Sequence, residues 1–307
     1  MSQHKSGLDA AEYHKLTGFE GDWRDSWWDE DYLAFMASRW RLAEVRAALD
    51  LGCGVGHWGQ RLARYFHPEA RMVGIDAEPE WMAGAAERAR ARGLRATYQV
   101  ADARELPFED DRFDLVTCQT VLMHIDDVDT VLQQARRVLR PGGLFLCAEP
   151  NNFGSSAAEF VRDPVADWPT MKALMELEIT CARGKEALGE GWYSIGERIP
   201  KLLRAQGFSE VDLRLNNQCA PLVPGDGTVA LMKTTYEAGG ITQAGGTREN
   251  AERMWLAGGG DPTRFEELFQ IARRRLARVI EAAERGEATG AGGHLHYLIW
   301  GRKPGLQ

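Results

Sequence analysis

This sequence has no closely spaced cysteine pairs, no long apolar runs and no excess of basic residues. The five cysteines among its 307 residues are far apart, and none forms a Cys-x-x-Cys pair. This spacing argues against a zinc site or a disulfide framework and favours reduced thiols. No run approaches the roughly 20 apolar residues that a membrane-spanning helix needs, so we expect no membrane span.

Acidic residues outnumber basic ones, with 45 Asp and Glu against 37 Lys and Arg and a net charge of −8. Proteins that bind nucleic acid over an extended surface usually carry a basic face, so this balance disfavours a nucleic-acid partner. The first 16 residues are polar and contain no apolar segment of the secretory type. We therefore expect a cytoplasmic location.

Between residues 47 and 150 the sequence alternates regularly between short apolar runs and amphipathic stretches. The apolar runs predict strands at 47–50, 71–76, 96–100, 113–118 and 144–148. The amphipathic stretches predict helices at 58–65, 78–92 and 128–139. Because the strands read as continuous apolar runs, we expect an α/β fold with a mostly parallel sheet and helices on both faces.

The pattern changes after residue 150. Residues 151–192 are mostly helical in character, and residues 217–260 are rich in glycine and predict loops with a short helix near 229–236. Further elements are predicted as a helix at 195–205, a strand at 211–215, a helix at 262–284 and a strand at 296–300.

A glycine-rich motif follows the first predicted strand and reads Asp50-Leu51-Gly52-Cys53-Gly54-Val55-Gly56. Glycines let the backbone turn sharply and approach a ligand without a clash at Cβ. The helix that follows presents free N–H groups to polar or anionic ligand groups. The spacing of Gly54, Gly56 and Gly59 also fits a dinucleotide fingerprint, so an NAD-binding protein stays open at this point.

Polar side chains also follow the next three strands. Asp76 ends the second strand, where a carboxylate can accept hydrogen bonds from both hydroxyls of a ribose. Asp102 follows the third strand, where a carboxylate can accept from an adenine amino group. Gln119 follows the fourth strand, and Leu139-Arg140-Pro141-Gly142-Gly143 precedes the core of the fifth.

This ordered set of motifs resembles the class I S-adenosylmethionine-dependent methyltransferases, in particular the branch with ubiquinone- and menaquinone-biosynthesis enzymes and many small-molecule methyltransferases. The resemblance covers about residues 42–150, with looser support from 195–215 and 294–302. It implies a Rossmann-like sheet of seven strands with the last strand antiparallel. It also implies S-adenosylmethionine as cofactor, S-adenosylhomocysteine as product and a small organic acceptor.

The resemblance assigns cofactor-binding roles by motif position, to Asp50, Gly52, Gly54, Gly56, Asp76, Asp102, Ala103 and Gln119. The first two would face the methionine part of the cofactor, and the next two glycines would let the loop pass close to it. The carboxylate after the second strand would hold the ribose, and the pair after the third strand would contact adenine. The glutamine would lie near the sulfonium.

Two residues are candidates for a general base that deprotonates the acceptor. His124 lies just beyond the fourth strand, and an imidazole titrates near neutral pH; a structural or cofactor-positioning role for it is equally open. Tyr193 is the second candidate. Glu149, Asn151 and Asn152 follow the fifth strand, but Gln119 and Thr120 follow the fourth, an incomplete ligand set for a hard cation. We expect no metal.

We expect a single methyltransferase domain over residues 1–307. Residues 42–150, 194–216 and 292–303 would form its Rossmann-like core, and residues 1–41, 151–193 and 217–291 its cap or substrate-binding elements. The cap segments are rich in tryptophan and other aromatic residues, which suits an organic acceptor with apolar or aromatic surface. A hydroxyl or an amine of such an acceptor would receive the methyl group.

Three alternatives belong to other functional classes. The first is a methyltransferase acting on tRNA or protein. Methylation of nucleic-acid bases is disfavoured, because Gln119-Thr120-Val121-Leu122 stands where many enzymes that methylate such nitrogens have Asn/Asp-Pro-Pro-Tyr. An NAD(P)-dependent oxidoreductase is opposed by the start of the glycine motif at Asp50 and by Asp102. A non-catalytic binding protein that kept the fold is opposed by the intact glycine motif.

Overall fold

The computed structural model describes residues 27–162, 167–217, 247–287 and 295–305, with short pieces at 220–221, 229, 232–233, 236–237, 239 and 291–292. The chain divides into two compact units. Among the described residues, the sheet unit comprises 27–151, 194–217 and 295–305, and the helical unit comprises the rest. Residues 27–41 thus lie in the sheet unit, whereas the sequence grouped them with the cap.

The sheet unit is built on seven strands in the order β3-β2-β1-β4-β5-β9-β6. Their bounds are β1 Ala47–Leu51, β2 Arg71–Asp76, β3 Ala96–Val100, β4 Phe113–Gln119, β5 Leu139–Pro150, β6 Ser209–Leu215 and β9 His296–Arg302. β9 is antiparallel to both of its neighbours, and the other neighbouring strands pair in parallel. This topology confirms the Rossmann-like sheet with an antiparallel last strand.

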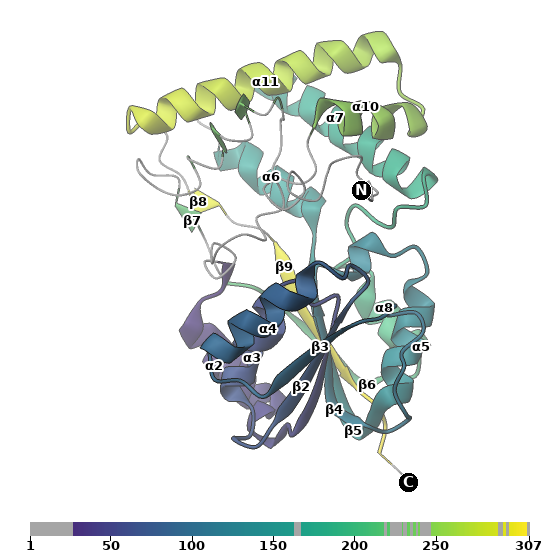
Figure 1. Cartoon of the computed structure of the whole chain (residues 1–307). Coiled ribbons are helices and arrows are strands. Elements are labelled where there is room, and N and C mark those ends of the chain that lie inside the picture. Colours follow the sequence, from purple (N-terminus) through teal and green to yellow (C-terminus); the bar gives the residue numbers. More distant parts are fainter. Residues whose placement is uncertain are drawn as a thin grey trace. The chain divides into compact units, whose positions relative to one another are not determined.

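Helices cover both faces of the sheet, with α2, α3 and α4 on one face and α5 and α8 on the other (Figure 1). Their bounds are α2 Glu30–Trp40, α3 His57–Leu62, α4 Trp81–Ala91, α5 Val128–Val138 and α8 Ile199–Ala205. Short 3₁₀ turns are η2 Leu42–Glu44, η3 Ala63–Tyr65 and η4 Leu122–His124. The helical cover on both faces explains why the central strands are apolar throughout.

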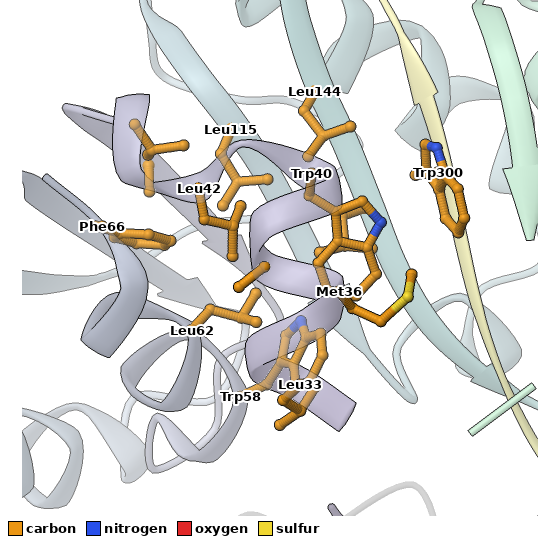
Figure 2. Packing of buried hydrophobic residues seen from close by; sticks show 14 of the residues in the cluster. Leu33, Met36, Trp40, Leu42, Trp58, Leu62, Phe66, Leu115, Leu144 and Trp300 are labelled. Carbon is orange, nitrogen blue, oxygen red and sulfur yellow. The ribbon is translucent and has the colours of Figure 1, made fainter. Parts of the chain in front are cut away.

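The helix α2 shows how the sequence builds this layer. The Asp29 side chain caps the helix by accepting the N–H of Tyr32 at 2.7 Å. Leu33, Met36 and Trp40 recur at helical spacing and are buried. Burying each such side chain contributes about 1.5–3 kcal/mol relative to its exposure. Figure 2 shows them packed among Trp58, Leu62, Phe66, Leu115, Leu144 and Trp300.

The helical unit contains α6 Asn152–Arg162, α7 Trp168–Ala187, α10 Arg248–Ala257 and α11 Pro262–Glu284, with a short antiparallel pair of β7 Ala220–Pro221 and β8 Ala291–Gly292. α7 and α11 begin at aspartate caps, Asp167 and Asp261, each followed by a proline in the first turn. The core of this unit consists of Ala173, Leu174, Leu177, Ala251, Trp255, Phe265, Leu268, Phe269 and Ala272. Its own apolar core makes it a compact body.

The structure corrects the sequence-based prediction at two places. Within 217–260, where the glycine content predicted loops, residues 248–257 form α10, because Thr247 caps the N–H of Asn250 and Arg248 pairs with Glu252 one turn later. β5 begins at Leu139 instead of residue 144, since Leu139 already pairs with β4 across an irregularity in the register. The helix predicted near 229–236 falls largely outside the described residues. None of the helices that the structure describes combines the length and apolarity needed to cross a bilayer.

Candidate active site

The predicted cofactor residues of the sheet unit gather at one edge, where β1, β2, β3 and β4 end. These strands are parallel, so their carboxyl ends meet at the same edge of the sheet. In open α/β sheets this edge, at the point where the strand order reverses, is where ligands bind. The reversal lies between β1 and β4, directly beside the glycine motif.

The glycine loop between β1 and α3 adopts a backbone that other residues rarely take. Gly52, Gly54 and Gly56 have φ values of +58°, +50° and +83°, in the left-handed region that favours glycine. A Cβ on Gly52 would lie 2.6 Å from a methyl carbon of Val121, and one on Gly56 would lie 2.3 Å from Nε2 of Gln60. Both the conformation and the space therefore require glycine at these two positions.

Asp50 lies beneath α3 and is almost fully buried, at 1% exposure. Its Oδ2 accepts the N–H of Gly59 at 3.1 Å, and a Cβ on Gly59 would lie 2.4 Å from the same oxygen. Burial raises the pKa of Asp50 to about 8, against the lowering effect of the Gly59 N–H and with a smaller raising effect from Asp76. The carboxyl group thus anchors α3, and its contact with the methionine part of a cofactor stays a prediction.

Asp50→Asn is expected to remove a pH dependence of stability between about pH 4 and about pH 8. In this interval the native Asp50 holds a proton that the unfolded chain, with a pKa near 3.8, has released. Wild-type stability therefore falls as pH rises, by about 1.4 kcal/mol per pH unit from this group. Asparagine cannot ionise, and its Oδ1 can still accept the Gly59 N–H. Urea unfolding of both proteins across this range should show the advantage of the variant growing with pH; a constant difference would contradict the raised pKa.

Asp76 connects the end of β2 to the glycine loop. Its Oδ2 accepts the N–H of Gly54 at 2.8 Å and its Oδ1 accepts the N–H of Glu78 at 3.1 Å. Burial raises the pKa of this carboxyl group, while the backbone hydrogen bonds lower it. An ionised carboxylate can accept about four hydrogen bonds. The two oxygens of Asp76 accept two from backbone N–H groups, so they can still accept hydrogen bonds from ribose hydroxyls.

The segment after β3 is more open. Asp102 is exposed, and both of its oxygens accept hydrogen bonds from Arg104, at 2.8 Å to Nη2 and 3.1 Å to Nε. Ala103, the residue between Asp102 and Arg104, is half-buried. The bidentate arrangement fixes the carboxylate plane but also occupies part of its acceptor capacity. Adenine recognition by Asp102 and Ala103 stays a prediction.

Gln119 closes β4 with a buried amide, at 8% exposure. Among the residues that the structure describes, no acceptor lies within hydrogen-bond distance of its Nε2. A buried donor left without a partner costs about 1–3 kcal/mol. The next residue, Thr120, has φ +51°, a strained backbone for a β-branched residue that is typical of functional sites. A ligand oxygen beside Gln119 would satisfy the amide.

Glu149 of β5 holds the turn that follows Gln119. Its carboxylate is completely buried, and Oε1 accepts the N–H groups of Val121 and Leu122, each at 2.9 Å. The carboxylate therefore orders the turn. His124 ends the same turn, η4, and is exposed, so the structure leaves its side chain accessible.

Tyr193, the second candidate base, belongs to the helical unit. Its hydroxyl donates to Oε1 of Glu178, which also accepts from Ser156. Its ring lies 5.1 Å from that of Phe153. The predicted residues thus fall into two groups: Tyr193 is in the helical unit, and His124 and all the cofactor positions are in the sheet unit.

Three residues near the described strand ends were not among the residues predicted from the sequence: Gln60, Tyr98 and His296. Gln60 and Tyr98 join α3 to β3 through a hydrogen bond of 2.8 Å. His296 begins β9, is buried, and its ring centroid lies 5.0 Å from that of Trp27. One signal was available: Gly74 stands alone inside β2, and an isolated strand glycine often marks a close approach by another group, here the Tyr98 ring.

Comparisons with known proteins show the family of the chain. A family model described as a methyltransferase domain matches residues 44–207, more than half of the chain. The chain is 32% identical over 149 residues to the demethylmenaquinone methyltransferase of Geobacillus kaustophilus, covering 47% of this chain and 62% of that protein. It is 33% identical over 126 residues to the mitochondrial 2-methoxy-6-polyprenyl-1,4-benzoquinol methylase of Homo sapiens, covering 39% and 37%. The chain therefore spans less than two thirds of the length of these relatives.

Solved structures share the fold at low sequence identity. SpnF, a 4+2 cyclase, superposes with a TM-score of 0.50 at 20% identity, covering 96% of this chain and 95% of SpnF. The phosphoethanolamine N-methyltransferase 2 of Haemonchus contortus, solved in complex with S-adenosyl-L-methionine, has a TM-score of 0.50 at 18% identity, covering 98% and 59%. The same fold thus carries a methyltransferase in one case and a cyclase in the other.

Proposed function

The chain belongs to the methyltransferase-domain family, and from this premise we propose that it transfers the methyl group of S-adenosylmethionine to a small organic acceptor. The observation that carries the proposal is the link at the carboxyl edge of the sheet, where Asp76 accepts the N–H of Gly54 at 2.8 Å. This bond places a carboxylate suited to a ribose directly beside a loop suited to the rest of an adenosyl ligand.

The residues at this edge fit the proposed cofactor in shape and in hydrogen bonding. Gly52 and Gly56 give the loop its tight course, because their positive φ values favour glycine and an added Cβ would clash with Val121 or Gln60. Asp76 offers acceptors for two ribose hydroxyls. The buried Nε2 of Gln119 is a donor without an acceptor among the described residues, and an oxygen of the methionine carboxylate or of the acceptor would satisfy it.

The chemistry asks little of the protein beyond positioning. When bound, S-adenosylmethionine supplies a methyl group that is activated because it is carried on a sulfonium, which departs as a neutral thioether. Side chains that align an acceptor atom with the methyl–sulfur bond can lower the barrier by about 7–11 kcal/mol. If the acceptor atom is a hydroxyl or an ammonium, a base such as His124 would add about 10²–10⁴-fold. His124 is exposed at the end of η4, and we keep it ahead of Tyr193 for this role.

A small organic acceptor is favoured by the names of the relatives. The two proteins compared above are named for a menaquinone precursor and a benzoquinol, and a third, from Synechococcus elongatus, is a 2-phytyl-1,4-naphtoquinone methyltransferase that is 38% identical over 110 residues. All three acceptors are aromatic or quinonoid rings. We propose an acceptor with an apolar ring for this chain and retain the helical unit as the predicted source of acceptor-binding residues.

Calorimetry with S-adenosylhomocysteine and NAD tests the proposal. We expect S-adenosylhomocysteine to bind with one site per chain and NAD to give no measurable heat. A panel of phenols and hydroquinones incubated with S-adenosylmethionine should then release S-adenosylhomocysteine for at least one acceptor. If the product never binds, the cofactor assignment is wrong; binding without turnover on small acceptors, with turnover on bulk tRNA or protein, would favour a macromolecular acceptor.

A further inference from the structure

Three consecutive residues of α3 are fastened to one transverse row of the sheet. The row is set by strand register, in which Asp50 of β1 pairs with Gly74 of β2 and with Thr117 of β4, and Gly74 pairs with Tyr98 of β3. Side chains in register on neighbouring strands lie on the same face. This row therefore presents three polar groups to the underside of α3.

Each of the three groups holds a different residue of the helix. Trp58 donates from Nε1 to the hydroxyl of Thr117 at 2.7 Å. Gly59 donates its N–H to Asp50, and Gln60 donates from Nε2 to the hydroxyl of Tyr98 at 2.8 Å. The contacts span three strands, so α3 has little freedom to rotate or slide on the sheet.

Tyr98 reaches the glycine loop because β2 has no side chain in its way. A Cβ on Gly74 would lie 2.5 Å from Cδ1 of the Tyr98 ring. The Tyr98 hydroxyl would in turn lie 3.2 Å from a Cβ on Gly56, and Nε2 of Gln60 would lie 2.3 Å from it. The pair of Tyr98 and Gln60 thus packs directly against Gly56, the last glycine of the loop and the residue that precedes α3.

The Gln60 amide is held in one orientation by the same bond. Gln60 is fully buried, and Nε2 donates to the carbonyl of Ala85 at 2.9 Å as well as to Tyr98. In the part of the chain that the structure describes, Oε1 has no donor within hydrogen-bond distance. Without the Tyr98 hydroxyl, one buried N–H would also lose its partner, which favours rotation of the amide against Gly56.

We propose that Tyr98 and Gln60 are positioning residues that keep Gly56, and with it the glycine loop, in the conformation that binds the cofactor. The inference rests on the proposed function, because the loop is the predicted cofactor site. If the bond is lost, the binding-competent loop becomes a smaller fraction of the native ensemble, and the apparent dissociation constant rises by the inverse of that fraction.

Tyr98→Phe tests the role, because it removes one oxygen and leaves the ring over Gly74. Calorimetry with S-adenosylhomocysteine should show about threefold to tenfold weaker binding, the range that one hydrogen bond supports. Tyr32→Phe is the matched control, since its hydroxyl also donates a single bond, to the carbonyl of Leu215 at 3.0 Å beside the edge strand β6. The control should bind S-adenosylhomocysteine like wild type and lose less thermal stability than Tyr98→Phe, because its hydrogen bond is exposed.

A double-mutant cycle with Gln60→Met separates positioning from general stability. If the two residues act through their bond, Tyr98→Phe should weaken binding by less than about twofold in the Gln60→Met background. Equal Tyr98→Phe and wild-type affinities would overturn the inference, and so would equal losses of affinity in both Tyr variants. Failure of the wild-type chain itself to bind S-adenosylhomocysteine would instead refute the proposed function, and the positioning role would fall with it.

Discussion

Asp76→Ala is expected to weaken the binding of S-adenosylhomocysteine about a hundredfold or more. Two effects combine. The variant would lose the acceptors for two ribose hydroxyls, and hydrogen bonds to a charged group contribute about 1.5–3 kcal/mol each. It would also leave the N–H groups of Gly54 and Glu78 without the acceptor that now holds them. The glycine loop would lose one of its connections to β2, while the bond from the Cys53 N–H to the carbonyl of Ile75 remains. Calorimetry at a fixed pH measures the change directly.

Asp114→Ala is the matched control for this experiment. Asp114 also accepts two backbone N–H groups, those of Arg46 and Ala47, each at 2.9 Å. It lies near the start of β4, at the opposite edge of the sheet from Asp76. Its removal should lower the melting temperature without changing the affinity for S-adenosylhomocysteine. If both alanine variants bind equally well, or Asp76→Ala binds like wild type, Asp76 does not hold the ribose.

Gly184→Ala is expected to destabilise the helical unit by more than about 4 kcal/mol, the range reserved for severe core disruption. α7 and α10 approach so closely that a Cβ on Gly184 would lie 1.6 Å from the carbonyl oxygen of Met254. From the other side, a Cβ on Gly258 would lie 2.1 Å from the carbonyl oxygen of Thr180. Both obstacles are backbone atoms, so neither can turn aside, and the helices would have to separate and open the core around Trp255.

Hydrogen–deuterium exchange resolves this effect by region. Peptides from α7 and α10 should lose protection in Gly184→Ala, while peptides from β1 and β4 keep theirs. Gly84→Ala is a control that should stabilise the protein. Gly84 lies inside α4, and among the residues that the structure describes its added Cβ would meet a Val55 methyl carbon at the ordinary contact distance of 3.6 Å. That variant should gain about 0.5–1 kcal/mol from helix propensity. Unchanged protection of α10 in Gly184→Ala would contradict the close contact between the helices.

The strands and their polar termini were predictable because their signals are local. The sequence predicted β1, β2, β3 and β4 to within about one residue, and parallel strands necessarily share a carboxyl edge. The α11 helix was predicted at its observed bounds, since its apolar spacing continues unbroken from the proline that follows its cap. The α10 helix was missed because the glycines around it outweighed a short periodic stretch.

The sequence by itself determined the order of the strands and of the helices between residues 47 and 150, and that polar residues end the central strands at a common edge. Only the tertiary structure decided which distant residues touch. Asp50 lies under Gly59, Tyr98 reaches Gln60 across Gly74, and Gly184 contacts the backbone of α10. The physical reason is that periodicity specifies a face of an element, whereas a contact between distant residues depends on strand register and on the volumes of every side chain packed between them.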